Sequence, residues 1–370
     1  MLAELNNHPH ARAVLGPALA PGGEPSHAYL FHGPGGAGKR SFTRALCAEL
    51  LADGSPDPDS ARARALAGSH PDLTWVVPGG AHEILVSDVD GPVIAAASRR
   101  PFESSRRMFV IERADELGDE AANRMLKTLE EPAPFVHLIL LTERLGEVLP
   151  TIRSRCQLVR FNAPSVEQVA AALEEGSVSA EGALACARLS LGDATRARQL
   201  VAEEGTALRA SAEAFARATL AGEAGARRPW LDVLEAVRAR GESLRAELED
   251  RMAAELELVP RKERKRVQTE WTERTRRARR RAETGALDLA LQLVELWFTD
   301  LACLEWGAGE LVRNCDRSSK LAADAGRDPA RLREAVELVE DTRVRFKLNV
   351  SEELACEALA YRLERVLCGT

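Results

Sequence analysis

Two short stretches of the chain combine residue types that bind and act on phosphate. The first, Gly33-Pro-Gly-Gly-Ala-Gly-Lys39, is a glycine-rich loop whose backbone N–H groups and terminal ammonium can surround phosphate oxygens. The second is Ser154-Arg155-Cys156, which we place just after a strand; the guanidinium of Arg155 is planar, forked and always charged. Such an arginine can neutralise charge that develops on a γ-phosphate held by a neighbouring subunit. Alone, the second stretch is more often a surface arginine beside a small buried cysteine, and its company in the sequence favours the phosphate interpretation.

The elements around the glycine-rich loop are those that a phosphate-binding loop requires. An apolar strand, Ala28 to Phe31, leads into the loop, and a helix from Ser41 to Leu51 is expected to follow it. The same reasoning predicts strands at 70–77, 108–111 and 136–141, and helices at 89–98 and 120–130. Strands that alternate with helices predict a parallel, doubly wound sheet. The polar stretch 53–69 is expected to leave this core.

The length and composition predict a multidomain, mainly helical protein. The chain has 370 residues, of which 45% are hydrophobic and only 4% aromatic. From Ser165 onward the pattern is helical, and it includes a charged helix over 260–282 that we pair with a core helix over 287–306. The predicted architecture is an α/β P-loop domain with a parallel sheet over 1–162, a small helical lid over 163–206 and an all-α collar over 207–370, which oligomerises.

Charge and cysteine usage exclude several classes of protein. The net charge of −7 argues against a protein that coats nucleic acid with its whole surface. The seven cysteines show no C-x-x-C spacing, which predicts reduced thiols, a cytoplasmic location and no zinc or other metal site. The N-terminus has no basic and apolar leader pattern, and no apolar run reaches membrane-spanning length. We therefore expect a soluble, intracellular protein with no membrane partner.

A local basic segment stands out against the negative net charge. Residues 261–281 contain eleven lysines and arginines but only three glutamates. Wrapped as a helix, this density of charge covers nearly every face, so a solvated helix is the favoured interpretation. The alternative is a salt-sensitive contact with duplex phosphates, which would need little sequence specificity.

The residues that should hold Mg²⁺ and activate water are replaced. A working P-loop enzyme follows its lysine with Ser or Thr, but Lys39 is followed by Arg40. The strand that ends at Ile111 should lead into Asp-Glu, but the chain has Glu112-Arg113. We predict that the chain does not hydrolyse ATP. Whether the loop binds ATP or ADP weakly or is purely structural stays open.

Four stretches together resemble the delta-prime subunit family of bacterial DNA polymerase III clamp loaders, which belongs to the AAA+ proteins. They are the loop Gly33 to Lys39, the run Ala121-Ala-Asn-Arg-Met-Leu-Lys-Thr-Leu-Glu-Glu-Pro132, the strand end Leu141-Thr142 and the motif Ser154-Arg155-Cys156. The resemblance implies that Arg155 is a catalytic arginine finger that acts on a neighbouring subunit, and that Thr142 occupies the sensor-one position. It also implies a degenerate nucleotide site made of Gly33, Gly38, Lys39, Arg40, Glu112, Arg113 and Thr142.

The resemblance also implies a function and partners. The chain would be a stator without ATPase activity of its own or required cofactor, within the DNA polymerase III holoenzyme, a DNA-directed DNA polymerase complex. It would join the delta and gamma/tau subunits in a hetero-oligomeric ring that places the sliding clamp on primer-template DNA during replication. Two rivals are an active gamma/tau-like ATPase and a free-standing AAA+ remodelling enzyme.

Two departures from the family pattern accompany the resemblance. Family members usually carry a four-cysteine zinc module in the place of residues 51–69, and this stretch contains no cysteine. The sensor-two arginine of active relatives would align with Thr195, with Arg196 one place away. Both departures fit a stator better than a motor, and the first predicts a chain without zinc.

Overall fold

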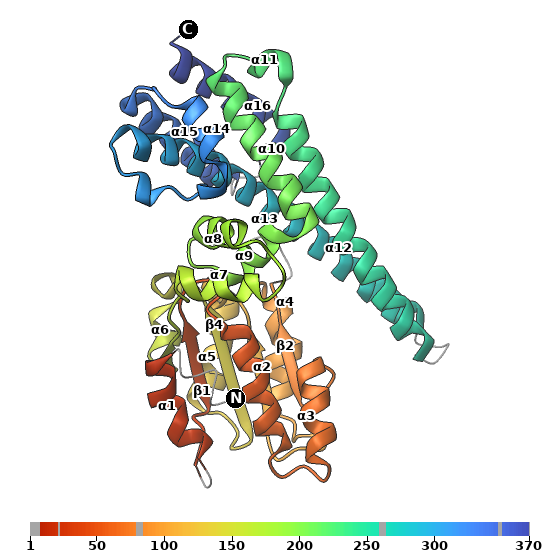
Figure 1. Cartoon of the computed structure of the whole chain (residues 1–370). Coiled ribbons are helices and arrows are strands. Elements are labelled where there is room, and N and C mark those ends of the chain that lie inside the picture. Colours follow the sequence, from red (N-terminus) through yellow and green to blue (C-terminus); the bar gives the residue numbers. More distant parts are fainter. Residues whose placement is uncertain (1–7, 21–22, 79–83, 259–263, 347–349, 370) are drawn as a thin grey trace. The chain divides into compact units, whose positions relative to one another are not determined.

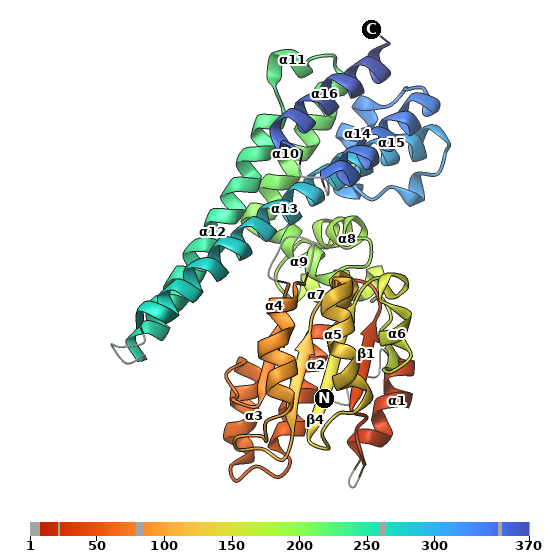
Figure 2. The ribbon, with the colours of Figure 1, turned by 180° about the vertical axis from the view of Figure 1, so that it is seen from behind.

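The fold is seen in a computed structural model that describes residues 8–20, 23–78, 84–258, 264–346 and 350–369. They divide into two compact units, Met1–Pro164 and Ser165–Thr370. The first unit is α/β and the second is entirely helical (Figures 1 and 2). This confirms the predicted fold class. None of the helices in the described ranges is long and apolar enough to cross a membrane.

A five-stranded parallel sheet forms the centre of the first unit. Its strands are β1 Ala28–His32, β2 Leu73–Val76, β3 Arg107–Ile111, β4 Val136–Thr142 and β5 Gln157–Arg160. They lie in the order β2-β3-β4-β1-β5, and each neighbouring pair is parallel. All seven residues of the central strand β4 are buried, as expected for a strand covered on both faces.

Helices cover both faces of the sheet because alternate strand residues point to opposite sides. They are α1 Pro9–Leu19, α2 Lys39–Ala52, α3 Pro58–Ala67, α4 Val86–Val89, α5 Asp119–Glu130 and α6 Pro150–Arg153, with a π-helical turn at Asp90–Ala95 and 3₁₀ turns at Ala114–Glu116 and Leu145–Glu147. Phe31 of β1 packs in the same cluster as residues of α1 and α2, whereas its neighbour Leu30 packs with residues of α5. The alternation produces the doubly wound arrangement predicted from the sequence.

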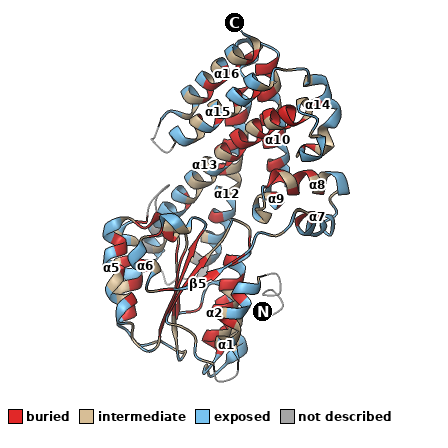
Figure 3. Cartoon of the chain, turned by 90° about the vertical axis from the view of Figure 1, so that its left-hand side faces the viewer, coloured by how far each residue is buried: buried red, intermediate tan, exposed pale blue. Residues whose placement is uncertain are grey.

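The second unit consists of helices around one continuous core. They are α7 Val166–Glu174, α8 Ala180–Leu189, α9 Ala194–Val201, α10 Glu203–Leu220, α11 Ala224–Arg227, α12 Trp230–Leu258, α13 Arg264–Glu305, α14 Ser318–Asp324, α15 Pro329–Arg345 and α16 Glu352–Cys368, with 3₁₀ turns at Gly309–Leu311 and Cys315–Arg317. Buried residues of α7 to α10 and of α12 to α16 belong to the same cluster (Figure 3). The division into a lid over 163–206 and a collar over 207–370 stays a prediction.

Three elements differ from the sequence-based prediction. The stretch 53–69 contains helix α3, which begins after Asp57, whose side chain accepts from the Ser60 N–H. The two helices expected at 260–282 and 287–306 are one helix, α13, over the residues that the structure describes; residues 260–263 lie outside the described ranges. Gly285 does not interrupt this helix. Glycine in a helix interior costs about 1 kcal/mol relative to alanine, and the packing of α13 on α12 and α15 outweighs this cost. The short strand β5 was not predicted.

Candidate functional site

The glycine-rich loop lies between β1 and the N-terminus of α2, as the phosphate-binding motif requires. Gly33 has φ of +144°, and a Cβ there would lie 2.2 Å from the Phe161 carbonyl oxygen, so no other residue fits. Gly38 caps α2 with φ of +80°, in the left-handed region. The Lys39 Nζ donates to the carbonyl oxygens of Gly33 and Pro34, each at 2.6 Å. The predicted loop residues therefore come together in one compact turn.

Arg40 and Glu112 contact each other directly. Arg40 lies in the first turn of α2, Glu112 follows the end of β3, and the Arg40 Nε lies 2.8 Å from the Glu112 Oε1. The same carboxylate oxygen accepts from the Trp75 Nε1 at 2.5 Å. Both residues that replace the expected metal ligands are thus engaged with one another. This arrangement does not fit a divalent cation, because a guanidinium lies next to the Glu112 carboxylate.

Thr142, Asp115, Arg144, Arg113 and Glu116 form a second network, of hydrogen bonds and ion pairs. The Thr142 hydroxyl donates to Asp115 Oδ1 at 2.7 Å, and the Arg144 Nε donates to Asp115 Oδ2 at 3.0 Å. Arg113, whose φ of +55° is left-handed, pairs with Glu116. The guanidinium at the expected position of the general base is therefore held by a local carboxylate and cannot accept a proton from water. Asp115 is the partner that fixes Thr142.

Arg155 lies in the turn between α6 and β5, not directly after a strand as predicted from the sequence. The 3₁₀ turn and α6 intervene after β4, so Arg155 precedes β5 instead. Its Nη1 donates to the Thr151 carbonyl at 3.0 Å and to the Ser154 Oγ at 3.2 Å. About a third of the side chain is exposed, at 33%. Among the described residues no contact joins Arg155 to the loop that contains Lys39.

Glu130 is a site residue that sequence reasoning missed. It is the last residue of α5, and its Oε1 accepts from the Arg155 Nε at 2.9 Å and also contacts Nη2. The carboxylate therefore fixes the direction of the guanidinium. In the sequence, Glu130 belongs to the run Ala121 to Pro132 and Arg155 to the motif Ser154-Arg155-Cys156. Only the fold shows that the end of α5 lies beside the turn that contains Arg155.

Cys156 completes the motif as a packing residue. It is buried, and burial raises the pKa of its thiol to about 12. A thiol with such a pKa stays protonated at neutral pH and is a poor nucleophile. Cys156 therefore supports the position of Arg155 and carries no chemistry of its own.

Three further features lie away from this site. In the described ranges no three His, Cys, Asp or Glu side chains are grouped so that they could hold a metal ion. The Arg196 Nη1 donates to Gln292 Oε1 of α13 at 2.6 Å, so packing within the second unit uses this side chain. Thr195 donates its backbone N–H to the capping residue Asp193 at 2.8 Å.

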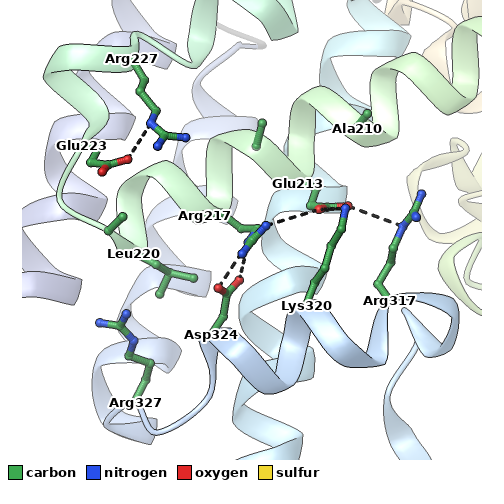
Figure 4. A pocket seen from close by; sticks show the side chains of 12 residues that line it. Ala210, Glu213, Arg217, Leu220, Glu223, Arg227, Arg317, Lys320, Asp324 and Arg327 are labelled. Atoms are coloured by element: carbon green, nitrogen blue, oxygen red, sulfur yellow. Dashed lines mark hydrogen bonds and ion pairs between the residues drawn. The ribbon is translucent and has the colours of Figure 1, made fainter.

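A pocket of about 570 Å³ on the second unit is lined mainly by α10 and α14 (Figure 4). Its acidic side chains are all paired with basic ones. Arg217 donates its Nε to Asp324 Oδ2 at 3.0 Å, Lys320 contacts Glu213, and Arg227 contacts Glu223. The pocket is therefore a network of ion pairs that ties α10 to α14.

The described part of the basic segment, residues 264–281, lies in the first half of α13, which packs beside α12 (Figure 2). Arg276 and Arg280 have exposed side chains, at 73% and 57%, and Arg277 is also exposed. Arg276 pairs with Glu273 and Arg280 with Glu352. Such exposed pairs are weak, so the arginines stay available to another anion.

Comparison with known proteins finds similarity within the first unit. Residues 14–165 match the profile of the family described as DNA polymerase III, delta subunit. DNA polymerase III subunit delta' of Bacillus subtilis is 35% identical over 158 residues, which cover 42% of this chain and 47% of that protein. The corresponding subunit of Pseudomonas aeruginosa is 35% identical over 140 residues, 35% of this chain and 42% of the relative. The chain thus spans less than half the length of these curated relatives.

Two other comparisons are weaker. DNA polymerase III subunit gamma/tau of Mycobacterium tuberculosis is 33% identical over 163 residues, which cover 41% of this chain and 27% of that protein. A solved gamma subunit-related protein of Thermotoga maritima aligns with 93% of this chain and 96% of its own, with a TM-score of 0.44 and 17% identity. A likeness at this level supports no conclusion about function.

Proposed function

We propose that the chain is the stator of a bacterial clamp loader, a proposal supported by the match of its residues 14–165 to the DNA polymerase III, delta subunit family and to delta' subunits. In this role it joins delta and gamma/tau subunits in a ring that places the sliding clamp on primer-template DNA, in the cytoplasm, during replication. It supplies Arg155 to the ATP site of a neighbouring subunit. It requires no cofactor and carries no zinc.

The observation that best supports a stator is the direct contact between Arg40 and Glu112. A motor subunit needs a hydroxyl and a carboxylate that hold Mg²⁺ at these positions. Here the two positions hold each other at 2.8 Å. The two alternatives, an active gamma/tau-like ATPase and a free-standing remodelling ATPase, both require these two positions to hold Mg²⁺ and not each other.

The purified chain is therefore expected to hydrolyse ATP no faster than background, with or without DNA. Arg40 and Arg113 stand where a metal ligand and a general base are needed, and each is paired with a carboxylate of its own chain. A phosphate-release assay on the isolated chain tests this result. Turnover that primed DNA stimulates would support one of the two ATPase alternatives instead.

The basic half of α13 is proposed to add phosphate contacts in the assembled loader. Neutralising Arg276, Arg277 and Arg280 to glutamine should flatten the dependence of log K on log salt by about 0.9 per lost contact with duplex DNA. The measurement is DNA binding by the reconstituted complex at several salt concentrations. The control variant replaces Arg227, Arg331 and Arg333, which are also exposed, with glutamine. It removes the same charge from other parts of the second unit. If both triple variants show the same slope, the basic half of α13 makes no specific phosphate contact and is a solvated helix.

A further inference from the structure

The two positions that would hold a divalent cation in a P-loop enzyme are joined in this chain by an ion pair. The residue after the loop lysine and the carboxylate at the end of the strand that corresponds to β3 normally share Mg²⁺ between them. Here those residues are Arg40 and Glu112, and the Arg40 Nε lies 2.8 Å from Glu112 Oε1. A fixed positive charge therefore lies next to the carboxylate that would otherwise bind the metal.

The Glu112 side chain is mostly buried in this contact, whereas the Arg40 side chain is exposed to solvent. The Glu112 side chain is 14% exposed, and its Oε1 also accepts from the Trp75 Nε1 at 2.5 Å. The Arg40 side chain is 62% exposed. Within the described part of the chain, its Nη1 and Nη2 groups make no hydrogen bond. The outer edge of the guanidinium can therefore take an anion while Nε stays beside Glu112.

The rest of the loop keeps groups that bind phosphate. The backbone N–H groups of Gly35, Gly36 and Gly38 donate to no acceptor in the described ranges. They lie at the N-terminus of α2, a helix of 14 residues, where the helix dipole favours negative charge. A guanidinium one residue into this helix adds a forked donor that matches two phosphate oxygens.

We propose that Arg40 takes the place of the divalent cation, so that this loop binds a nucleoside di- or triphosphate without metal. Glu112 then serves to hold Arg40, and Trp75 holds Glu112. The stator role does not require this binding, so either proposal can fail without the other.

The test is the binding of ADP and ATP labelled with N-methylanthraniloyl to the purified full chain, in EDTA and in Mg²⁺. The wild type is expected to bind with the same Kd, within about twofold, in both buffers, since the ligand already meets a fixed cation. Arg40→Ser restores a hydroxyl and removes the cation. It should weaken binding in EDTA by about tenfold or more, the loss of one charge-assisted contact, and Mg²⁺ should restore part of it.

Two further variants and a competitor sharpen the test. Arg40→Lys keeps the charge without the fork and should lie between wild type and Arg40→Ser. Arg62→Ser, on α3, makes the same change of charge where the guanidinium pairs with Glu49 and Asp59, and should leave binding unchanged. Competition by unlabelled pyrophosphate shows that the phosphates are the part recognised. Binding by the wild type that requires Mg²⁺, no binding in either buffer, or full binding by Arg40→Ser in EDTA would each overturn the proposal.

Discussion

Arg155→Ala is expected to slow ATP turnover and clamp loading by the assembled complex while leaving this chain folded. An arginine finger contributes about 10³ to 10⁵ in rate at the site that it completes, and other sites in the ring dilute the loss that is observed. The stability of the chain should change little, because a partly exposed ion pair such as Arg155 with Glu130 is worth at most about 1 kcal/mol. The measurement is ATPase stimulated by DNA and clamp, with complexes rebuilt from each variant.

Arg153→Ala is the matched control for this experiment. Arg153 is the last residue of α6 and donates to the Leu145 carbonyl at 3.4 Å, so it has the same charge two residues away but a local packing role. It should load clamps at the wild-type rate. If Arg153→Ala is impaired and Arg155→Ala is not, the finger has been assigned to the wrong residue; if neither matters, the trans-acting role is wrong.

Glu130→Gln is expected to reduce turnover at the same site by about ten- to a hundredfold, less than the loss of Arg155 itself. The substitution keeps the shape of the side chain but removes the charge that holds the Arg155 Nε at 2.9 Å. A small displacement of a catalytic group can cost about 10²-fold in rate. Assembly and melting temperature should be unchanged, and these are measured on the same complexes.

The neighbouring Glu131→Gln separates position from charge. Glu131 is also exposed and follows Glu130 directly, so it is expected to have no effect. If Glu130 acts through Arg155, the double variant with Arg155→Ala should be no slower than Arg155→Ala alone. Losses that simply add in the double variant would contradict a positioning role for Glu130.

The sheet and the conformation of the glycine-rich loop could be predicted because their signals are local. The run Val136 to Leu141 is apolar throughout, which is what a strand covered on both faces requires, and β4 lies there. Gly33 and Gly38 were predicted from the motif, and both occupy backbone conformations that favour glycine. Arg40 and Glu112 could be recognised as replacements because the motif fixes what each position should hold.

The features that were missed depend on contacts distant in sequence. Glu130 reaches Arg155 across 25 residues, and Asp115 reaches Thr142 across 27, which no spacing rule predicts. The continuity of α13 through Gly285 depends on packing against α12 and α15. The strand β5 is short and mostly exposed, so it lacks the apolar run that reveals a buried strand.

The most direct test of the stator role is assembly with the other loader subunits of the same organism. The purified chain is mixed with delta and gamma/tau subunits, separated by size-exclusion chromatography and assayed for clamp loading on primed DNA. We predict that the chain elutes within the complex and that loading depends on its presence. A chain that elutes apart from these subunits, or a complex that loads clamps equally well without it, would contradict the proposed function.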